Sequence, residues 1–162
     1  MKKIALFLLT VSFSAMSQEK YPRLGVGMQA NFPVFGISAK ADLTEKHSAQ
    51  AVLGVLGSVS SYYARYIYNF KEKETEIQIT LKPYLYGQAG YFVYDLGKTY
   101  NLDIDKESVF GFGFGGGLEW YYKPLTKDLK FNIELGYSKV DFDYYDFKSI
   151  SFGGGIHYYF NL

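Results

Sequence analysis

The sequence has no cysteine, only four prolines and one tryptophan, and no long hydrophobic run. The absence of cysteine excludes both a disulfide framework and a lipid anchor carried on a cysteine. The longest uncharged stretch, 48–64, contains several serines and falls short of the ~20 mostly apolar residues of a membrane-spanning helix. Charge is nearly balanced, with 17 Lys and Arg against 16 Asp and Glu, so no nucleic-acid partner or polybasic membrane patch is indicated.

Residues 1–17 have the three parts of a secretory signal peptide. Lys2 and Lys3 supply the positive start, an apolar run follows at 4–11, and Ala15-Met16-Ser17 resembles a cleavage site. We expect cleavage near Ser17, so that residues 18–162 form one domain. Loss of the two lysines leaves 15 Lys and Arg against 16 Asp and Glu in that domain. The alternative is an uncleaved anchor helix.

Aromatic residues and glycine are abundant, with 17 Tyr, 14 Phe and 17 Gly. Along most of the chain, apolar residues alternate with polar residues or glycine at a period of two, which predicts strands. Turn-forming residues separate the alternating stretches, and Pro83 inside the fifth predicts a strand start or a bulge there. The sequence therefore predicts eight strands, at 24–32, 35–43, 48–56, 61–70, 82–93, 109–122, 129–138 and 150–162.

One of these stretches, VFGFGFGGGLEWYY at 109–122, contains G-x-G-x-x-G at Gly111, Gly113 and Gly116. The dinucleotide-binding motif requires a helix after the glycines, and strand-favouring residues follow here instead. The phenylalanines occupy one face of the strand and the glycines the other. In an eight-stranded barrel, we expect the phenylalanines outside and the glycines inside, where they leave room for Tyr, Arg or Lys of the opposite wall. The alternative is that the glycines mark bulges or high curvature.

Three features favour a barrel with its apolar face outward. The polar face is rich in glycine and lacks the dense charge of a solvated surface. Aromatic residues gather near strand ends, as in the girdles of membrane barrels. The chain ends inside a strand with alternating apolar residues, namely Ile156, Tyr158, Phe160 and Leu162. The girdle residues expected at the periplasmic rim are Tyr68, Phe70, Trp120, Tyr122, Tyr158 and Phe160.

The ending GGGIHYYFNL resembles the C-terminal strand signal of Gram-negative outer-membrane barrels, with Leu162 where Phe is commoner. The segments PYLYGQAGYF, GFGFGGGLEWYY and FNIELGYS resemble the OmpA/OmpX-like small outer-membrane β-barrel family. The resemblance covers nearly all of residues 18–162. It implies an all-β, eight-stranded antiparallel up-and-down transmembrane β-barrel in the cell outer membrane. It also implies that outer-membrane lipids, and a barrel-insertion machinery that recognises the last strand, are its partners.

Charged residues fall on the inward face of several expected strands. Pairing across the turns at 71–76 and 123–128 predicts that Arg65 lies near Lys82 and that Glu119 lies near Glu134. Two bases on one wall and two acids on another predict an ion-pair cluster across the lumen, because opposed charges can satisfy one another. Lys40 and Asp42 are expected to form an adjoining pair. The cluster either closes the barrel as a static polar core or gates a narrow ion path.

We therefore expect a monomeric barrel with a structural or surface-interaction role and a lumen filled by polar and aromatic side chains. A narrow channel for small solutes or ions and a soluble lipocalin-like barrel that binds an apolar ligand are the alternatives. We expect no enzymatic activity and no cofactor, because His47 and His157 are the two histidines and neither suits chemistry at the outer leaflet. His157 is expected to bond a tyrosine or a glutamate in the lumen. The acidic residues Asp103, Asp105, Asp141 and Asp143 lie in outer loops without the spacing of an EF-hand.

Overall fold

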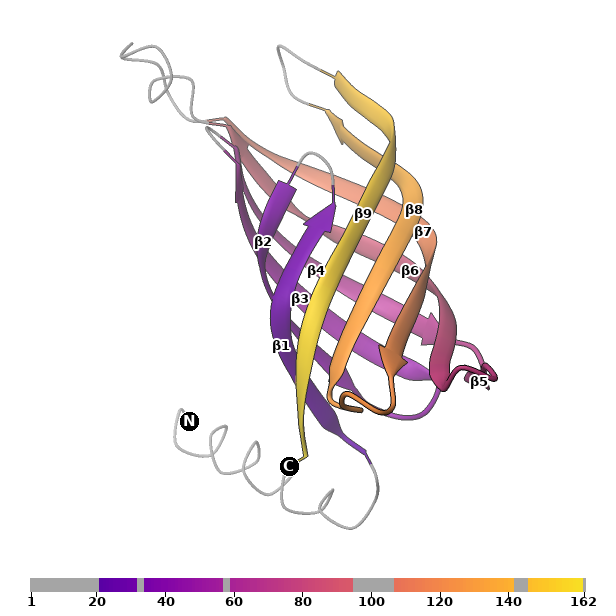
Figure 1. The fold of residues 1–162 in the computed structure, drawn as a ribbon. Helices are drawn as coiled ribbons and strands as arrows, with labels where there is room; N and C mark the ends of the chain where they lie inside the picture. The colour runs from indigo at the N-terminus through magenta and orange to yellow at the C-terminus, as the bar shows by residue number, and fades with distance from the viewer. Residues whose placement is uncertain (1–20, 32–33, 57–58, 95–106, 142–145, 162) are drawn as a thin grey trace, which may run out of the picture.

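The computed structural model describes residues 21–31, 34–56, 59–94, 107–141 and 146–161, and it is built of β-strands (Figure 1). The order in the sheet is β4-β3-β2-β1-β9-β8-β7-β6-β5, and β4 also pairs with β6. Eight long strands thus close an antiparallel barrel, as the sequence predicted. No helix in these ranges is long and apolar enough to span a membrane. The strands are β1 (Arg23–Asn31), β2 (Val34–Asp42), β3 (His47–Leu56), β4 (Val59–Asn69), β5 (Lys73–Glu74), β6 (Ile79–Tyr94), β7 (Glu107–Tyr122), β8 (Leu129–Asp141) and β9 (Asp146–Asn161).

The two ends of the barrel differ. β1 begins and β9 ends at the lower rim in Figure 1, where the segments 43–46, 70–78 and 123–128 also connect strands. We call this end the turn rim and the other end the loop rim. The turns expected at 43–46 and 123–128 are present. The strand expected to start at 150 starts instead at Asp146, because Ser149, Lys148 and Phe147 continue the pairing with β8.

β5 continues β4 past a bulge at the turn rim. Asn69 pairs with Tyr84 and Lys73 pairs with Leu81, so the β4–β5 side advances four residues while β6 advances three. The additional residue falls at Lys71–Glu72, between the backbone bond from Phe70 N–H to the Pro83 carbonyl (2.9 Å) and the short β5 ladder. A bulge of this kind bends its strand and redirects side chains.

The expectation of a strand start or bulge at Pro83 was therefore wrong for β6 itself. β6 starts at Ile79 and pairs with β7 residue by residue through Pro83 and Leu118. Proline is tolerated because its nitrogen faces the β4–β5 side, where the bulge interrupts the ladder and where Pro83 needs only its carbonyl.

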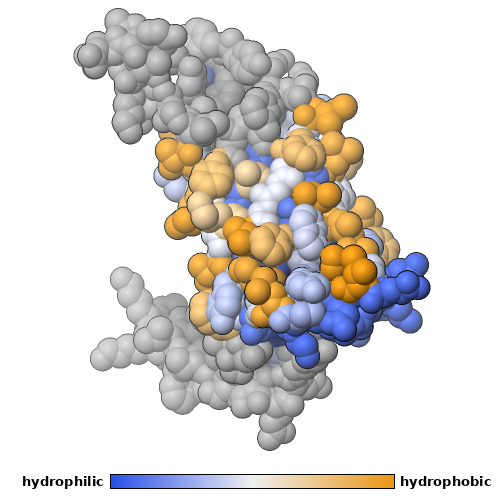
Figure 2. Space-filling view, in the orientation of Figure 1, coloured by the Kyte–Doolittle hydropathy of each residue, from blue (hydrophilic) through white to orange (hydrophobic). Residues whose placement is uncertain are grey.

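The barrel is apolar outside and mostly polar inside, although Val52, Ile67, Phe92 and Val140 are also buried there. On the outer wall, Leu135, Phe152 and Phe110 are 61%, 67% and 58% exposed. In the lumen, Lys40 and Glu119 are 1% and 2% exposed. Apolar residues cover much of the wall visible in Figure 2, and hydrophilic residues gather at its lower right, where β5 lies in Figure 1. The orientation predicted from the sequence is the one observed.

Glycines on the inner face of β7 accommodate tyrosines of the neighbouring strand. Tyr84 pairs with Gly117 and Tyr86 with Gly115 across the β6–β7 ladder. A Cβ at Gly117 would lie 2.4 Å from the Tyr84 ring, and one at Gly115 would lie 2.7 Å from the Tyr86 hydroxyl. The glycines do make room for tyrosine, but for rings of the adjacent strand rather than of the opposite wall. Placing aromatic rings over glycines in this way also compensates the weak packing of a glycine-rich strand.

Candidate functional site

The candidate site is the charged lumen. Seven Asp, Glu, Lys and Arg side chains are almost fully buried there, although such residues are rarely buried unless they are paired. They project inward from five strands because each occupies the inward phase of the alternation. The seven are Lys40 and Asp42 on β2, Arg65 on β4, Lys82 on β6, Glu119 on β7, and Lys130 and Glu134 on β8.

The middle of the lumen contains a network around Arg65 and Glu134, which we call the central network. The two Arg65 NH groups donate to the two oxygens of Glu134 at 3.0 and 2.7 Å, a bidentate geometry that ranks among the strongest charge-assisted bonds. The Tyr84 hydroxyl donates to Glu134 Oε1 at 2.6 Å, and Gln29 donates to Oε2 at 3.1 Å. Arg65 also lies over the Tyr86 ring, 4.0 Å from its centroid.

The central network crosses the lumen from wall to wall. Arg65 on β4 also donates to Gln50 on β3 at 3.1 Å, and Gln50 donates to Ser38 on β2 at 2.7 Å. Gln29 on β1 accepts a bond from Asn132 on β8 at 3.2 Å. Side chains of six strands therefore meet across one level of the barrel.

A second network, which we call the rim network, lies closer to the turn rim. Glu119 accepts bonds from Lys40 at 2.5 Å and from Lys130 at 3.1 Å. Lys130 also lies 3.7 Å from Asp42, and Asp42 accepts a bond from Ser48 at 2.7 Å. The Lys130 ammonium sits over the Tyr159 ring at 4.2 Å. Both buried carboxylates of this network thus face cations, as buried charges require.

The bulge supplies an additional acid at the turn rim. The seven buried charges comprise four cations and three anions, an excess of one positive charge among the described lumen residues. Glu72, on the bulge, lies 3.7 Å from the Lys82 ammonium and offsets that excess. Further out, Glu74 of β5 hydrogen-bonds Lys123, and this bond raises the pKa of the Lys123 ammonium.

The predicted pairing of a base with an acid across the lumen is present between Arg65 and Glu134, but the predicted neighbours along the walls were wrong in register. Arg65 pairs with Gln88 across β4–β6, and Lys82 lies six residues further along β6, roughly 20 Å at ~3.3 Å per residue. Glu119 pairs with Asn132, so Glu134 lies one level higher and binds Arg65. The β4–β6 register differs from the predicted one by six residues mainly because the chain turns at 75–78, after β5, and the bulge shifts the register by one residue.

Lys40 and Asp42 were expected to form a pair with each other, and the structure gives them different partners. Lys40 bonds Glu119 across the lumen, and Asp42 lies near Lys130. Two residues apart on one strand, their side chains point the same way but are displaced along the barrel axis. Each side chain therefore reaches a different position along the barrel axis and a different partner on the opposite wall.

Sequence reasoning missed Lys130 and three tyrosines of the networks. Lys130 has the same inward phase in β8 as Glu134, and this phase was the available signal. Tyr84 and Tyr159 donate to Glu134 and Glu119, at 2.6 and 3.4 Å. Tyr86 stacks on Arg65. These tyrosines share the phase of neighbouring polar residues, but composition alone did not mark them as partners of the charges.

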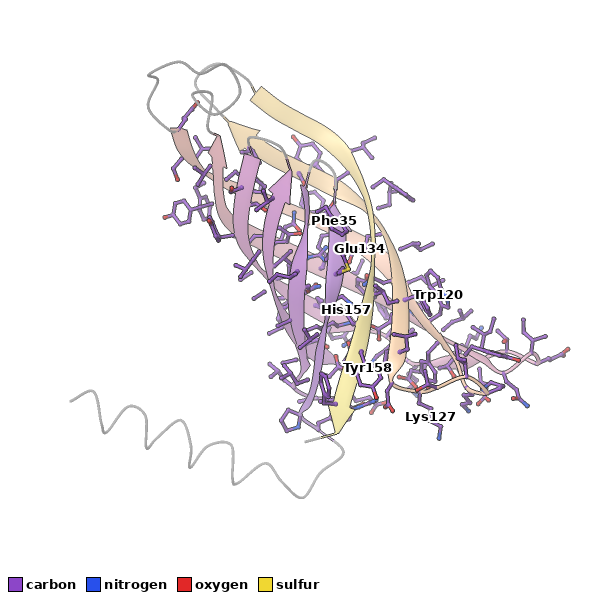
Figure 3. The ribbon with its side chains drawn as sticks, turned by 60° about the vertical axis from the view of Figure 1, so that its left-hand side comes forward. Phe35, Trp120, Lys127, Glu134, His157 and Tyr158 are labelled. Atoms are coloured by element: carbon purple, nitrogen blue, oxygen red, sulfur yellow. The ribbon has the colours of Figure 1, made fainter. Side chains whose placement is uncertain are left out.

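The expected girdle residues lie at the turn rim with outward-facing rings. Phe70, Tyr122, Tyr158 and Phe160 are exposed, whereas Tyr68 and Trp120 are partly covered. Trp120 stacks on Phe131 with ring centroids 6.0 Å apart, and Tyr158 meets Phe160 edge-on at 5.2 Å. Of the C-terminal signal, Ile156, Tyr158 and Phe160 share the outward phase of β9, and Leu162 lies outside the described residues. Figure 3 shows Tyr158 near the turn rim and Phe35 toward the loop rim.

The remaining candidate residues are the two histidines and the acidic residues. His157 contacts Ser38 Oγ at 3.0 Å and Gln50 at 3.4 Å, so the expected bond to a tyrosine or glutamate was wrong. His47 contacts the Tyr66 hydroxyl at 2.6 Å on the outer wall. Within the described ranges, no cluster of three or more His, Asp or Glu could hold a metal ion. The expected signal peptide at 1–17 and the residues Asp103, Asp105 and Asp143 lie outside the described residues, and Asp141, expected in a loop, is the last residue of β8.

Comparison with solved structures gives one informative match. The N-terminal β-barrel domain of Pseudomonas aeruginosa OprF matches 85% of this chain and 96% of its own, with 17% identity and a TM-score of 0.55. The chain has the fold of a small outer-membrane β-barrel. Neisserial surface protein A matches 85% of this chain and 90% of its own, with 12% identity and a TM-score of 0.41. Ail of Yersinia pestis matches 85% of this chain and 95% of its own, with 14% identity and a TM-score of 0.35.

Sequence comparison adds nothing to this barrel's identity, because no family model and no curated protein matches it. At 17% identity, the shared property is the arrangement of strands. Function has to be argued from the lumen and the outer wall.

Proposed function

We propose that this protein is an integral outer-membrane barrel with a structural or surface-interaction role and a lumen closed by its own side chains. The main support is the inverted distribution of polarity. Charged residues of both signs are buried inside, and bulky apolar residues are exposed over the outer wall. In water this arrangement would expose an extensive apolar surface, whereas in a bilayer the same surface meets acyl chains.

The same distribution opposes a soluble carrier of an apolar ligand. A lipocalin-like carrier needs an apolar interior, but this lumen contains ion pairs and hydrogen-bonded amides. The turn rim, with its short connections, then faces the periplasm and the loop rim faces outward. In this orientation, β9 closes the barrel against β1 and presents its outward aromatic residues to the insertion machinery.

The direct test has two steps. The protein is expressed with its native N-terminus, membranes are fractionated, and the sample is run on a gel with and without boiling. We expect the protein in the outer-membrane fraction, with faster migration before boiling than after it, because a closed barrel resists detergent. Recovery of the full protein in the soluble fraction without detergent would overturn the proposal.

Planar-bilayer conductance separates a closed barrel from a narrow channel. The central and rim networks both cross the lumen, so we expect no steady current from the refolded protein. Reproducible single-channel steps would support the narrow channel, with the ion pairs acting as its gate. Glu134→Gln, which weakens the central network, serves as the comparison, because a gate would open more often in this variant.

A further inference from the structure

The outer wall contains a groove at the ends of β2, β3 and β4 toward the loop rim. Its volume is about 400 Å³, within the range of small-molecule sites. Its sides are the outward side chains of Phe35, Ile37, Leu53, Val55 and Tyr62, which are 45–62% exposed. Figure 3 shows Phe35 in this part of the barrel.

A pair of glycines forms part of the groove. Gly36 and Gly54 are cross-strand partners between β2 and β3, and their backbones line the groove. A Cβ at Gly36 would lie 2.2 Å from the Leu53 carbonyl oxygen and 2.5 Å from the Gly54 Cα. The backbones of β2 and β3 therefore approach closely at this point, and a larger residue at Gly36 would not fit.

The chemistry of the groove selects an apolar occupant. Ile37 pairs with Leu53, and Leu53 with Tyr62, so a continuous apolar row crosses three strands. The Tyr62 hydroxyl is the one polar side-chain group among the lining residues. A ligand that needs several hydrogen bonds or a counter-charge would leave them unsatisfied here.

The groove alone is too small to form a stable protein interface. A standard protein interface takes roughly 20–30 residues from each side. This groove is lined by seven. A segment of another barrel could touch it, but the contact would lack the area on which specific association depends.

We propose that this groove binds one acyl chain of a membrane lipid in the leaflet nearer the loop rim. The inference rests on the proposed membrane location, since the wall meets lipid only if the barrel is inserted. The bound chain would exchange more slowly than the other lipids around the barrel. It would fill a hollow that bulk lipid would otherwise cover with poor packing.

The test counts lipids that stay with the barrel. The mature protein is refolded into palmitoyl-oleoyl phosphatidylcholine vesicles, extracted in mild detergent and weighed by native mass spectrometry. We expect the wild type to carry a lipid that Ile37→Trp, which fills the groove, loses. Leu135→Trp is the matched control, because Leu135 is 61% exposed on the far wall and Ile37 is 62% exposed. This control should keep the lipid.

Each other outcome contradicts the inference in a recognisable way. A wild type that inserts and shifts on gels but carries no lipid would refute the groove alone. Equal lipid retention in Ile37→Trp and Leu135→Trp would do the same, and a mass of two copies that Ile37→Trp abolishes would replace the lipid by a second barrel. A wild type that stays soluble without detergent would refute the proposed function as well.

Discussion

At the scale of single residues, the stability of the barrel depends on buried ion pairs. Loss of one partner leaves the charge of the other buried without a counter-charge. Removal of Glu134 leaves the Arg65 guanidinium buried without a counter-charge, and it also removes the acceptor of the Tyr84 hydroxyl. We expect Glu134→Ala to lower the free energy of unfolding by about 3–5 kcal/mol. Urea unfolding of the refolded protein in detergent micelles measures this change.

A double variant controls for the loss of the pair itself. Arg65→Met combined with Glu134→Leu removes both charges and keeps their volume, so it should recover part of the stability lost in Glu134→Ala, although the Tyr84 hydroxyl still lacks its acceptor. A double variant as unstable as the single one would show that the pair does not act as a unit.

The glycines of the inner wall allow a second residue-scale test. A Cβ at Gly115 would lie 2.4 Å from the Leu135 carbonyl oxygen and 2.7 Å from the Tyr86 hydroxyl. We expect Gly115→Ala to destabilise the barrel by about 1–3 kcal/mol, because the added methyl overpacks the lumen. Gly87 on neighbouring β6 faces outward with open space, so Gly87→Ala should be neutral or stabilise by up to ~1 kcal/mol. Equal effects in the same unfolding experiment would contradict this explanation of the glycines.

At the scale of strands, the sequence predicted the number, order of occurrence and facing of the elements. A period of two is visible in residues such as Phe110, Phe112 and Phe114 because the wall separates two environments. Register was not predictable in the same way. The bulge at Lys71–Glu72 adds one residue to one side of a ladder, and no local residue pattern distinguished it from a simple turn. The six-residue displacement of Lys82 from Arg65 depended mainly on the turn at 75–78, which follows β5, and the bulge shifted the register by one residue.

The bulge also explains why Pro83 is tolerated, and this explanation can be tested. Pro83 uses its carbonyl toward Phe70 on the side where the ladder is interrupted. We expect Pro83→Ala to change the free energy of unfolding by less than ~0.5 kcal/mol. The backbone N–H of Leu85, two residues after Pro83, also faces β4, but Leu85 pairs with Tyr68 inside the uninterrupted ladder. Leu85→Pro removes a donor from that ladder and should prevent folding. Urea unfolding measures the effect of Pro83→Ala, and heat-modifiable migration on gels reports whether Leu85→Pro folds. A heat-modifiable Leu85→Pro barrel would be the contrary result.

At the scale of the whole molecule, the barrel reverses the usual arrangement of a soluble protein. Its ion pairs and amides lie inside, and exposed phenylalanines and leucines such as Phe112 and Leu135 lie outside. Closure of the sheet by the β4–β6 pairing leaves no long edge strand among the described residues, so every backbone group in the wall can be paired within the barrel. The arrangement is stable only where the outer wall avoids water, and the proposed membrane location supplies that condition.

Site-directed spin labelling tests this orientation most directly, and the absence of native cysteine makes it simple. Nitroxides are attached to the variants Phe112→Cys, Leu135→Cys and Phe152→Cys in refolded vesicles. Their relaxation is then measured with oxygen, which concentrates in lipid, and with a water-soluble nickel complex. We expect strong relaxation by oxygen and little by nickel at all three sites. Strong relaxation by nickel at these sites would contradict a lipid-facing outer wall and, with it, the proposed function.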